Sequence, residues 1–340
     1  MNLFIIGAGF TKAVFPDAPL NGDLIERLAS VFPDSKSSIL RERYNTKDVE
    51  IALTRLDVEL SSLLNSQGGS DDELKKLRQH IDGELASYLT SFCASEDLIV
   101  NSPWMSCFID KVFSSGDVIV SLNYDCALEG ALDCRGRWTP NGGYGPYLDN
   151  PLVSEGDVEK SPVTVLKIHG SVNFIIAPYA DKPAAKAVGY ILDEPFFPHS
   201  AKNTHFGYGA GTGKTYLIAP SYIKVPTVEI SYLMLEALKA STDAKNLIII
   251  GSALRPEDAF LTLLITNFLH QHGWRDRKII IIDPAAQAIS ERLNLYWGVN
   301  VSDQIVPIAG CLEDSLAHLQ EAIKLRKTKC CAIELRKDRK

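Results

Sequence analysis

The feature that most constrains the fold is a series of short, almost continuously apolar segments rich in Ile and Val. They separate longer stretches in which apolar residues recur at helical spacing. An uninterrupted apolar run suits a strand that is covered on both faces, as strands of a parallel sheet are. The predicted strands are Leu3–Ile6, Asp117–Leu122, Val163–Ile168, Tyr216–Ala219, Asn246–Ile250, Lys278–Ile282 and Gln304–Ile308.

Helical segments follow many of these strands. Strands that alternate with helices form parallel β-α units, so the sequence predicts an α/β protein with a doubly wound, Rossmann-like parallel sheet. The predicted helices are Asp125–Leu132, Ile230–Ala240, Glu257–His270, Ala285–Tyr296 and Leu312–Arg326.

One region interrupts this alternation. Between the first two predicted strands lie about 110 residues of mostly helical pattern, which is too long for a simple crossover. We therefore expect an inserted helical subdomain at residues 31–114, a sheet domain made of residues 1–30 and 115–326, and a basic tail at 327–340. Within the insert, helices are predicted at Asp48–Leu64, Asp71–Phe92 and Pro103–Phe113.

Two further segments, Thr139–Pro162 and Ile175–Gly213, are rich in Gly, Pro, Asn, Tyr and Asp. Such composition is typical of turns and loops. We expect long loops here, with room for one hairpin, and consider them candidates for a lid over a binding site.

Composition narrows the class of protein. With 46% hydrophobic and 23% charged residues, the chain has an ordinary globular mix. A net charge of −7 supplies no general attraction for nucleic acid, so no direct nucleic-acid binding is expected. No apolar run approaches the length of a membrane span, and the start lacks the basic region of a signal peptide. We interpret residues 1–6 as part of the first strand and expect no membrane association.

The cysteines favour a reducing compartment. The chain has 7 Cys, an odd number, and no Cys-x-x-Cys pair. This argues against a disulfide scaffold and against a zinc site made of four thiolates. We therefore expect a cytoplasmic protein without a metal site.

Gly7, Ala8 and Gly9 directly follow the first strand. Such a loop allows the backbone to approach a pyrophosphate, whose charge is received by the N-terminus of the next helix. The dehydrogenase fingerprint requires Gly or Ala three residues after the second Gly, where this chain has Lys12. The sequence thus predicts a phosphate loop outside the dehydrogenase context, or a tight turn that binds nothing.

Polar side chains follow the second and third predicted strands. Asn123 and Asp125 come after the second, and His169 and Ser171 come after the third. Ligands of open α/β sheets bind outside the carboxyl ends of the strands, so we expect these residues to lie beside the glycine loop. Taken singly, Asp125 also suits a helix N-cap and His169 a hydrogen-bonded core residue. Together they indicate one binding site.

These motifs resemble the three signature motifs of the sirtuin superfamily, in the same order along the chain. Gly251 and Ser252 resemble a later strand end of that family, and Asp283 resembles the polar residue that faces the adenosine ribose. The resemblance covers roughly residues 1–30 and 117–310. The matching motifs are Gly-Ala-Gly-Phe-Thr at 7–11, Asn-Tyr-Asp at 123–125 and His-Gly-Ser at 169–171.

The chain also departs from the deacylase members of that family. After Cys134 the next cysteine is Cys311, so the four-Cys zinc module that follows the catalytic His in those members has no counterpart. The helical insert lies before Asn123, and Thr11 replaces the usual Ser. This pattern resembles the zinc-less, sirtuin-like branch of bacterial anti-phage defence, whose members hydrolyse NAD.

The resemblance implies an NAD hydrolase that uses NAD as its substrate, without zinc, and releases ADP-ribose and nicotinamide. Asn123 suits the orientation of water at the anomeric carbon, and His169 suits a general base. Asp125 is expected to orient its loop or to offset cationic charge. The expected NAD-binding residues are Gly7, Ala8, Gly9, Thr11, Ser171, Gly251, Ser252 and Asp283.

Two other functions stay open at this point. The protein is alternatively an NAD-dependent protein deacylase or ADP-ribosyltransferase, or a non-catalytic sensor that binds NAD or ADP-ribose. An enzyme that destroys NAD must stay inactive until it is triggered, and the chain has no recognisable sensor domain. We therefore expect control by assembly as a homo-oligomer, with or without a separate partner ATPase or sensor protein.

Overall fold

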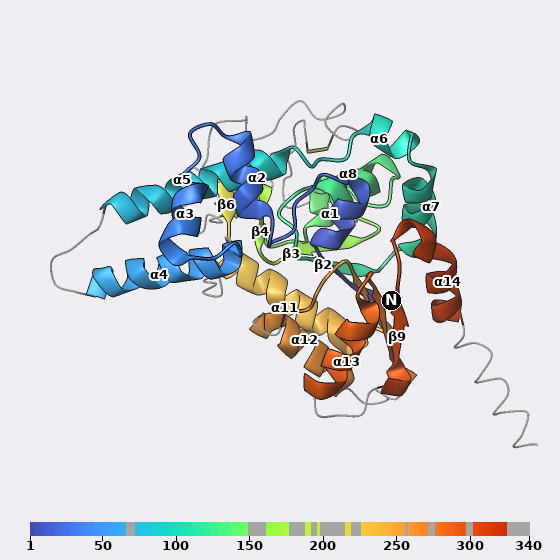
Figure 1. Cartoon of the computed structure of the whole chain (residues 1–340). Helices are drawn as coiled ribbons and strands as arrows, with labels where there is room; N and C mark the ends of the chain where they lie inside the picture. Colours follow the sequence, from blue (N-terminus) through green and yellow to red (C-terminus); the bar gives the residue numbers. More distant parts are fainter. Residues whose placement is uncertain are drawn as a thin grey trace, which may run out of the picture.

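The computed structural model describes residues 1–65, 72–148, 161–176, 188–191, 196–197, 215–218, 226–255, 258–270, 276–296 and 302–324. Within these ranges, six strands form a parallel sheet in the order β3-β2-β1-β7-β8-β9 (Figure 1). The strands are β1 (Leu3–Ile6), β2 (Val118–Ser121), β3 (Thr164–Lys167), β7 (Asn246–Ile250), β8 (Lys278–Ile282) and β9 (Ile305–Ile308).

This sheet confirms the predicted doubly wound α/β class. Every neighbouring pair of strands is parallel. Counted among themselves, the strands follow the order 3-2-1-4-5-6, which reverses between β1 and β7. β1 and β7 are wholly buried, as their continuous apolar sequences require. The carboxyl ends of β1 and β7 thus mark the point where ligands of such sheets bind.

Helices cover both faces of the sheet. Figure 1 shows α11, α12 and α13 together on one side, with α1 and α8 on the other. The predicted helix at 312–326 begins as a 3-10 turn at Glu313–Ser315 and continues as α14. The helices that accompany the sheet are α1 (Ala8–Val14), α8 (Ala127–Cys134), α11 (Val228–Asp243), α12 (Ala259–Leu269), α13 (Ala286–Tyr296) and α14 (Leu316–Lys324).

One predicted strand belongs to a different sheet. Tyr216–Ala219 was expected to join the parallel alternation, but β6 (Thr215–Leu217) pairs antiparallel with β4 (Gly170–Ile176). β4 also pairs with β5 (Val188–Tyr190), which gives a second, three-stranded sheet. A short apolar run does not specify the direction of its partner, which explains the error. The antiparallel β4–β5 pair lies where the sequence left room for a hairpin; residues 149–160, 177–187, 192–195 and 198–213 of the predicted loops lie outside the described residues.

The region between β1 and β2 is helical, as predicted. α4, α5 and α7 match the expected segments, and α2, α3 and α6 were not predicted. Figure 1 shows α3 and α4 projecting to one side of the sheet. The helices are α2 (Leu24–Val31), α3 (Ser37–Tyr44), α4 (Val49–Asn65), α5 (Asp72–Thr90), α6 (Glu96–Val100) and α7 (Pro103–Val112).

These helices divide between two hydrophobic cores. The buried side chains of α2, α3, α4 and the first part of α5 pack together in a core of their own, from Leu24 to Leu85. Met105 and Phe108 of α7 pack instead in the core of the sheet. The proposed division into a sheet domain, an insert at 31–114 and a tail stays a prediction, and the tail at 327–340 lies outside the described residues. None of the helices in the described ranges is long and apolar enough to cross a membrane.

The turns after β1 and β7 pack backbone against backbone. The Gly7 N–H donates to the Ile250 carbonyl at 2.9 Å, and the Gly9 N–H donates to the Gly251 carbonyl at 2.8 Å. A Cβ on Gly9 would lie 2.6 Å from the Gly251 Cα, and Gly251 itself has φ +60°. Glycine is therefore required here because the two backbones leave no room for a side chain.

We predict that Gly9→Ala lowers the free energy of unfolding by about 2 kcal/mol or more, because backbone would have to shift. Gly83→Ala, in the interior of α5 with nothing within 4 Å of the added Cβ, is the matched control. It should raise stability by roughly 0.5–1 kcal/mol through helix propensity. Urea unfolding of both variants measures the difference, and equal effects would contradict the packing argument.

Candidate functional site

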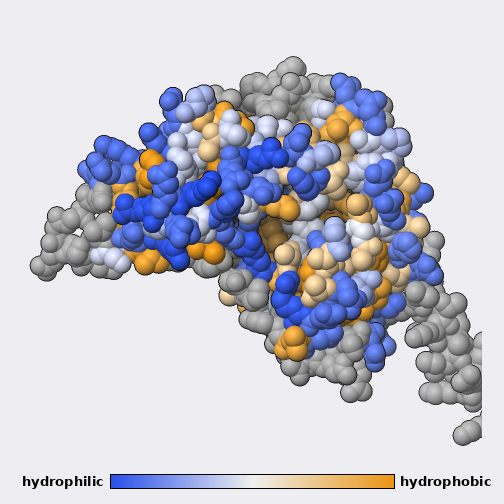
Figure 2. Space-filling model, in the orientation of Figure 1, coloured by the Kyte–Doolittle hydropathy of each residue, from blue (hydrophilic) through white to orange (hydrophobic). Residues whose placement is uncertain are grey.

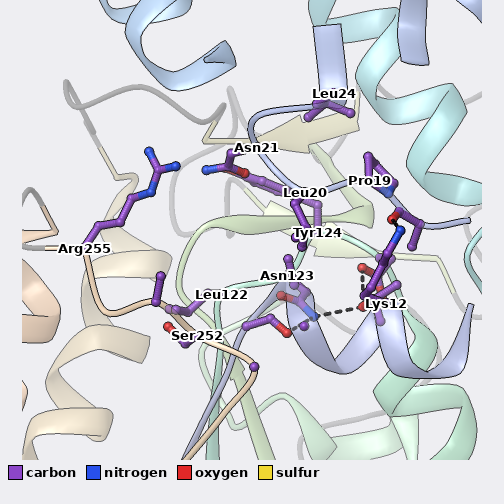
Figure 3. A pocket seen from close by; sticks show the side chains of 18 of the residues that line it. Lys12, Pro19, Leu20, Asn21, Leu24, Leu122, Asn123, Tyr124, Ser252 and Arg255 are labelled. Carbon is purple, nitrogen blue, oxygen red and sulfur yellow. Dashed lines mark hydrogen bonds between the residues drawn. The ribbon is translucent and has the colours of Figure 1, made fainter. Parts of the chain in front are cut away.

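A cavity of about 590 Å³ opens at the carboxyl ends of the strands, where the strand order reverses. This volume is typical of pockets that bind small molecules, which measure about 300–1,000 Å³. Figure 2 shows the hollow near the middle of one face of the molecule. In Figure 3, Asn123 and Ser252 lie on one side of it, and Pro19, Leu20 and Asn21 lie on the other.

The structure brings almost all predicted site residues to this one cavity. Ser171 is the exception, because it is fully buried and its Oγ donates to the Tyr124 carbonyl at 3.1 Å. Ser171 therefore holds the loop after β2 through a backbone carbonyl and does not line the cavity. The residues that do line it are Gly7, Ala8, Gly9, Thr11, Asn123, Asp125, His169, Gly251, Ser252 and Asp283.

The side-chain amide of Asn123 is held by its nitrogen. Nδ2 donates to the Gly7 carbonyl at 3.0 Å and to Thr11 Oγ1 at 2.9 Å. The residue is only 6% exposed, and Oδ1 has no hydrogen-bond partner among the residues that the structure describes. A buried carbonyl oxygen without a partner is costly, and such atoms mark places where a ligand or water supplies the bond.

Thr11 joins Asn123 to Asp125. Its hydroxyl accepts from Asn123 Nδ2 and donates to the carboxylate of Asp125, 3.0 Å from Oδ1 and 2.9 Å from Oδ2. The Ala127 N–H also donates to Asp125 Oδ1 at 3.1 Å, at the start of α8. Asp125 thus accepts the N–H of the first residue of α8, although Cys126 occupies the N-cap position, and it also lines the cavity.

A buried cation lies behind this carboxylate. Lys167 and Glu129 form a 2.8 Å ion pair, and both side chains are almost fully buried. Lys167 Nζ also donates to the backbone carbonyl of Asp125. Burial alone would lower the pKa of Lys167, but the nearby carboxylates outweigh it and raise that pKa, so the lysine stays charged.

Burial raises the pKa of Asp125 to about 6, although the positive charge of Lys167 and the Ala127 N–H oppose the change. Glu129 adds to the increase by repulsion, and the Thr11 hydroxyl lowers the pKa again. Asp125 is therefore mostly ionised at neutral pH, and it gains a proton when the solution becomes mildly acidic.

His169 has a carboxylate partner that the sequence did not predict. Its Nε2 lies 3.2 Å from Oδ2 of Asp258, and the side chains of both residues are nearly buried. The imidazole also lies near Tyr124, with 6.4 Å between the ring centroids. In the sequence, Asp258 shows only the signal of a helix N-cap, since it precedes the apolar run of α12.

The glycine turn packs against the turn after β7, and its binding of a phosphate stays a prediction. The N–H groups of Gly7 and Gly9 are both used in bonds to backbone carbonyls of the β7 turn, so neither is available to a phosphate. The two glycines instead allow the close packing that places Asn123, Thr11 and Ser252 around one space. Asp283 keeps its carboxylate partly exposed at the cavity while Oδ1 accepts the Ala285 N–H at 2.8 Å.

The rim of the cavity holds a charged cluster that the sequence did not reveal. Arg255 donates through one guanidinium nitrogen to Asp48 at 3.0 Å and to Glu50 at 2.7 Å. Asn21 donates to the same Glu50 carboxylate at 2.9 Å. These contacts join α4 and the segment before α2 to the turn after β7. In that turn, Leu254 has a positive φ of +47°. No local pattern indicates such long-range pairing.

Two further observations concern ligands. Among the described residues, no group of three or more His, Cys, Asp or Glu side chains is arranged to hold a metal ion. The cavity also has an apolar wall opposite the polar floor. This wall is formed by Ala18, Pro19, Leu20, Leu24, Leu89 and Phe92.

The sequence matches no protein-family model and no curated protein. Among solved structures, the chain is similar to an ADP-ribose complex of a mutant Sir2 homologue, with 12% identity, a TM-score of 0.37, and 95% and 94% of the two chains covered. It is also similar to a Sir2 protein bound to a myristoylated histone peptide, with 11% identity, a TM-score of 0.32, and 96% and 92% covered. Similarity at this level carries no weight for function, and the fold class rests on the sheet itself.

We predict that Asp125 makes stability depend on pH. Its pKa rises from 3.8 to about 6 on folding, so the folded state binds the proton more tightly and loses stability as the pH rises from about 4 to 7. The contribution is about 3 kcal/mol, at about 1.4 kcal/mol per pKa unit. Urea unfolding at several pH values should show wild type losing stability relative to Asp125→Asn over this range. A constant difference would show that the carboxyl group titrates normally.

Proposed function

We propose that this protein is an NAD glycohydrolase, which cleaves NAD to ADP-ribose and nicotinamide. The observation that carries the proposal is the position of Asn123 and His169 at one cavity, with the nitrogen of the Asn123 amide held and its oxygen without a described partner. The resemblance of the motifs to those of the sirtuin superfamily supports the choice of NAD as substrate.

The reaction breaks the bond between the nicotinamide nitrogen and C1′ of its ribose. The sugar then gains positive charge, and nicotinamide leaves as a neutral molecule. Water supplies the oxygen that bonds to C1′, and it gives up one proton. In the proposed mechanism, Asn123 Oδ1 accepts a hydrogen bond from this water and orients it, and His169 takes the proton.

Asp125 contributes through its charge. Its carboxylate is ionised at neutral pH and is held by Thr11 and the Ala127 N–H, so it cannot rotate away. A fixed negative charge in a water-poor site stabilises the positive charge that develops on the sugar. We propose this electrostatic role for Asp125 and leave the proton transfer to His169.

Two predicted residues, Asp283 and Ser252, suit the binding of NAD, and two basic residues that were not predicted line the same cavity. Lys12 and Arg255 both line the cavity and offer positive charge to the pyrophosphate, while Asp283 can accept hydrogen bonds from ribose hydroxyls. Ser252 adds a hydroxyl to the wall, and its Oγ already accepts the Leu254 N–H at 3.3 Å. Nothing in this assignment requires zinc, because the chemistry uses only an amide, an imidazole and a carboxylate.

We predict that Asn123→Ala and His169→Ala each abolish NAD hydrolysis without unfolding the protein, because each removes a group that acts on the attacking water. Chromatography of NAD, ADP-ribose and nicotinamide over time measures the loss. Asn101→Ala and His318→Ala change the same residue types at exposed positions and should leave turnover unaffected. Unchanged turnover in either site variant would remove the assignment.

The chromatographic assay, run with and without an added acceptor and combined with calorimetry, separates the alternative functions. A deacylase or ADP-ribosyltransferase would release nicotinamide only when an acyl-peptide or acceptor protein is added. A sensor would bind ADP-ribose in calorimetry without turnover. Hydrolysis of NAD with water as the only acceptor would support the proposed glycohydrolase over both.

For the biological role, we propose a cytoplasmic effector of a bacterial anti-phage defence system, on the basis of the same resemblance. Destruction of NAD would harm the host, so activity has to be controlled by assembly into a homo-oligomer, with or without a separate ATPase or sensor protein. We predict a mass above that of one 37.4 kDa chain in light scattering under activating conditions. A monomer with full activity would contradict control by assembly.

A further inference from the structure

The carboxylate of Asp258 is anchored at both oxygens. Oδ1 accepts the Leu261 N–H at 3.3 Å and caps α12, and Oδ2 lies 3.2 Å from His169 Nε2. The backbone N–H of Asp258 donates to the Arg255 carbonyl at 3.1 Å. α12 is itself fixed, because Leu261, Leu264 and Phe268 are buried in the main core. The imidazole thus contacts a charge with little freedom to move.

We propose that Asp258 is a positioning residue that fixes the orientation and the tautomer of His169. An ionised carboxylate only accepts hydrogen bonds, so the nitrogen that faces it, Nε2, has to carry the proton. The basic nitrogen of the neutral imidazole is then Nδ1. The tautomer follows from the contact alone, whereas its consequence for catalysis rests on the proposed NAD hydrolysis.

The contact also gives Asp258 an electrostatic role. When His169 takes a proton, the new imidazolium charge lies beside the Asp258 carboxylate, where both side chains are largely buried and the attraction is stronger than in water. The N-terminus of α12 stabilises the carboxylate in its ionised form, since helix N-termini favour negative charge. Asp258, which itself lines the cavity, is therefore suited to holding a base in place.

Asp258→Asn separates this role from helix capping. Asparagine caps helices about as well as aspartate, so its oxygen can keep the Leu261 N–H. Its NH2 group would then face His169 Nε2 and donate to it, which forces the proton onto Nδ1. The opposite rotation of the amide would keep the original tautomer but would place NH2 against the Leu261 N–H and lose the cap.

The direct test is 15N NMR of the histidine side chains in the full chain, with the His169 signals assigned by their loss in His169→Gln. Wild type should show His169 protonated at Nε2, and Asp258→Asn should show the proton on Nδ1. Asp258→Glu keeps the charge and should keep the Nε2 tautomer. A wild-type spectrum with the proton on Nδ1 would overturn the proposal, whether or not NAD is cleaved. So would an unchanged tautomer in Asp258→Asn together with an unchanged free energy of unfolding, which shows that the cap is kept.

Kinetics test the catalytic consequence. In Asp258→Asn, kcat for NAD should fall on the order of 10²- to 10⁴-fold while KM changes by less than about threefold. Asp258→Glu should recover part of the loss, and Asp303→Asn, which removes an exposed carboxylate elsewhere, should match wild type. If the proton moves from Nε2 to Nδ1 in Asp258→Asn and kcat does not change, the positioning role is overturned. If the wild type shows the expected spectra but does not cleave NAD, only the proposed function is contradicted.

Discussion

The hydroxyl of Thr11 is the contact on which the geometry of the site depends. It is almost fully buried, accepts from the Asn123 amide and donates to both oxygens of Asp125. Because Thr11 lies in α1 while Asn123 and Asp125 lie in the loop after β2, one hydroxyl links two segments that are distant in the sequence. It uses the amide nitrogen of Asn123 and leaves the oxygen for another partner. A side chain without a hydroxyl at position 11 would remove one hydrogen bond from each of two buried polar groups, leaving Asn123 with the Gly7 carbonyl and Asp125 with the Ala127 N–H.

A second constraint is the contact between the sheet and the helices inserted after β1. The cavity has a polar floor at the strand ends and an apolar wall from the segment around Leu20 and Leu24 and from Phe92 of the inserted region. Arg255, Asp48 and Glu50 connect the two parts at the rim. The inserted region thus contributes part of the cavity wall, and Glu50 of α4 lines the same cavity as Asn123 and His169. A ligand with a pyrophosphate would compete with Asp48 and Glu50 for Arg255.

Much of the fold follows from the sequence, because continuous apolar runs such as those of β1, β7 and β8 leave only the interior of a parallel sheet as a suitable place. The same reasoning places Asn123 and His169 together, since the carboxyl ends of parallel strands meet. It does not place Tyr216–Ala219, whose antiparallel partner depends on tertiary contacts. It also does not distinguish Ser171, which faces the backbone, from Ser252, which lines the cavity. The pairing of His169 with Asp258 could not be predicted from the sequence, because no local pattern relates a strand end to a distant helix cap.

We propose that Asn123 and His169 act on the same ribose, beside the turn after β1. The test is a crystal structure of the wild-type protein with bound ADP-ribose, because the proposed reaction ends at this product and the wild-type chain keeps both side chains. We expect the distal ribose to lie at Asn123, with a water or ribose oxygen within hydrogen-bond distance of Oδ1, and the adenosine ribose to lie near Asp283. ADP-ribose bound elsewhere, or a cavity that stays unoccupied at saturating ADP-ribose, would contradict the account.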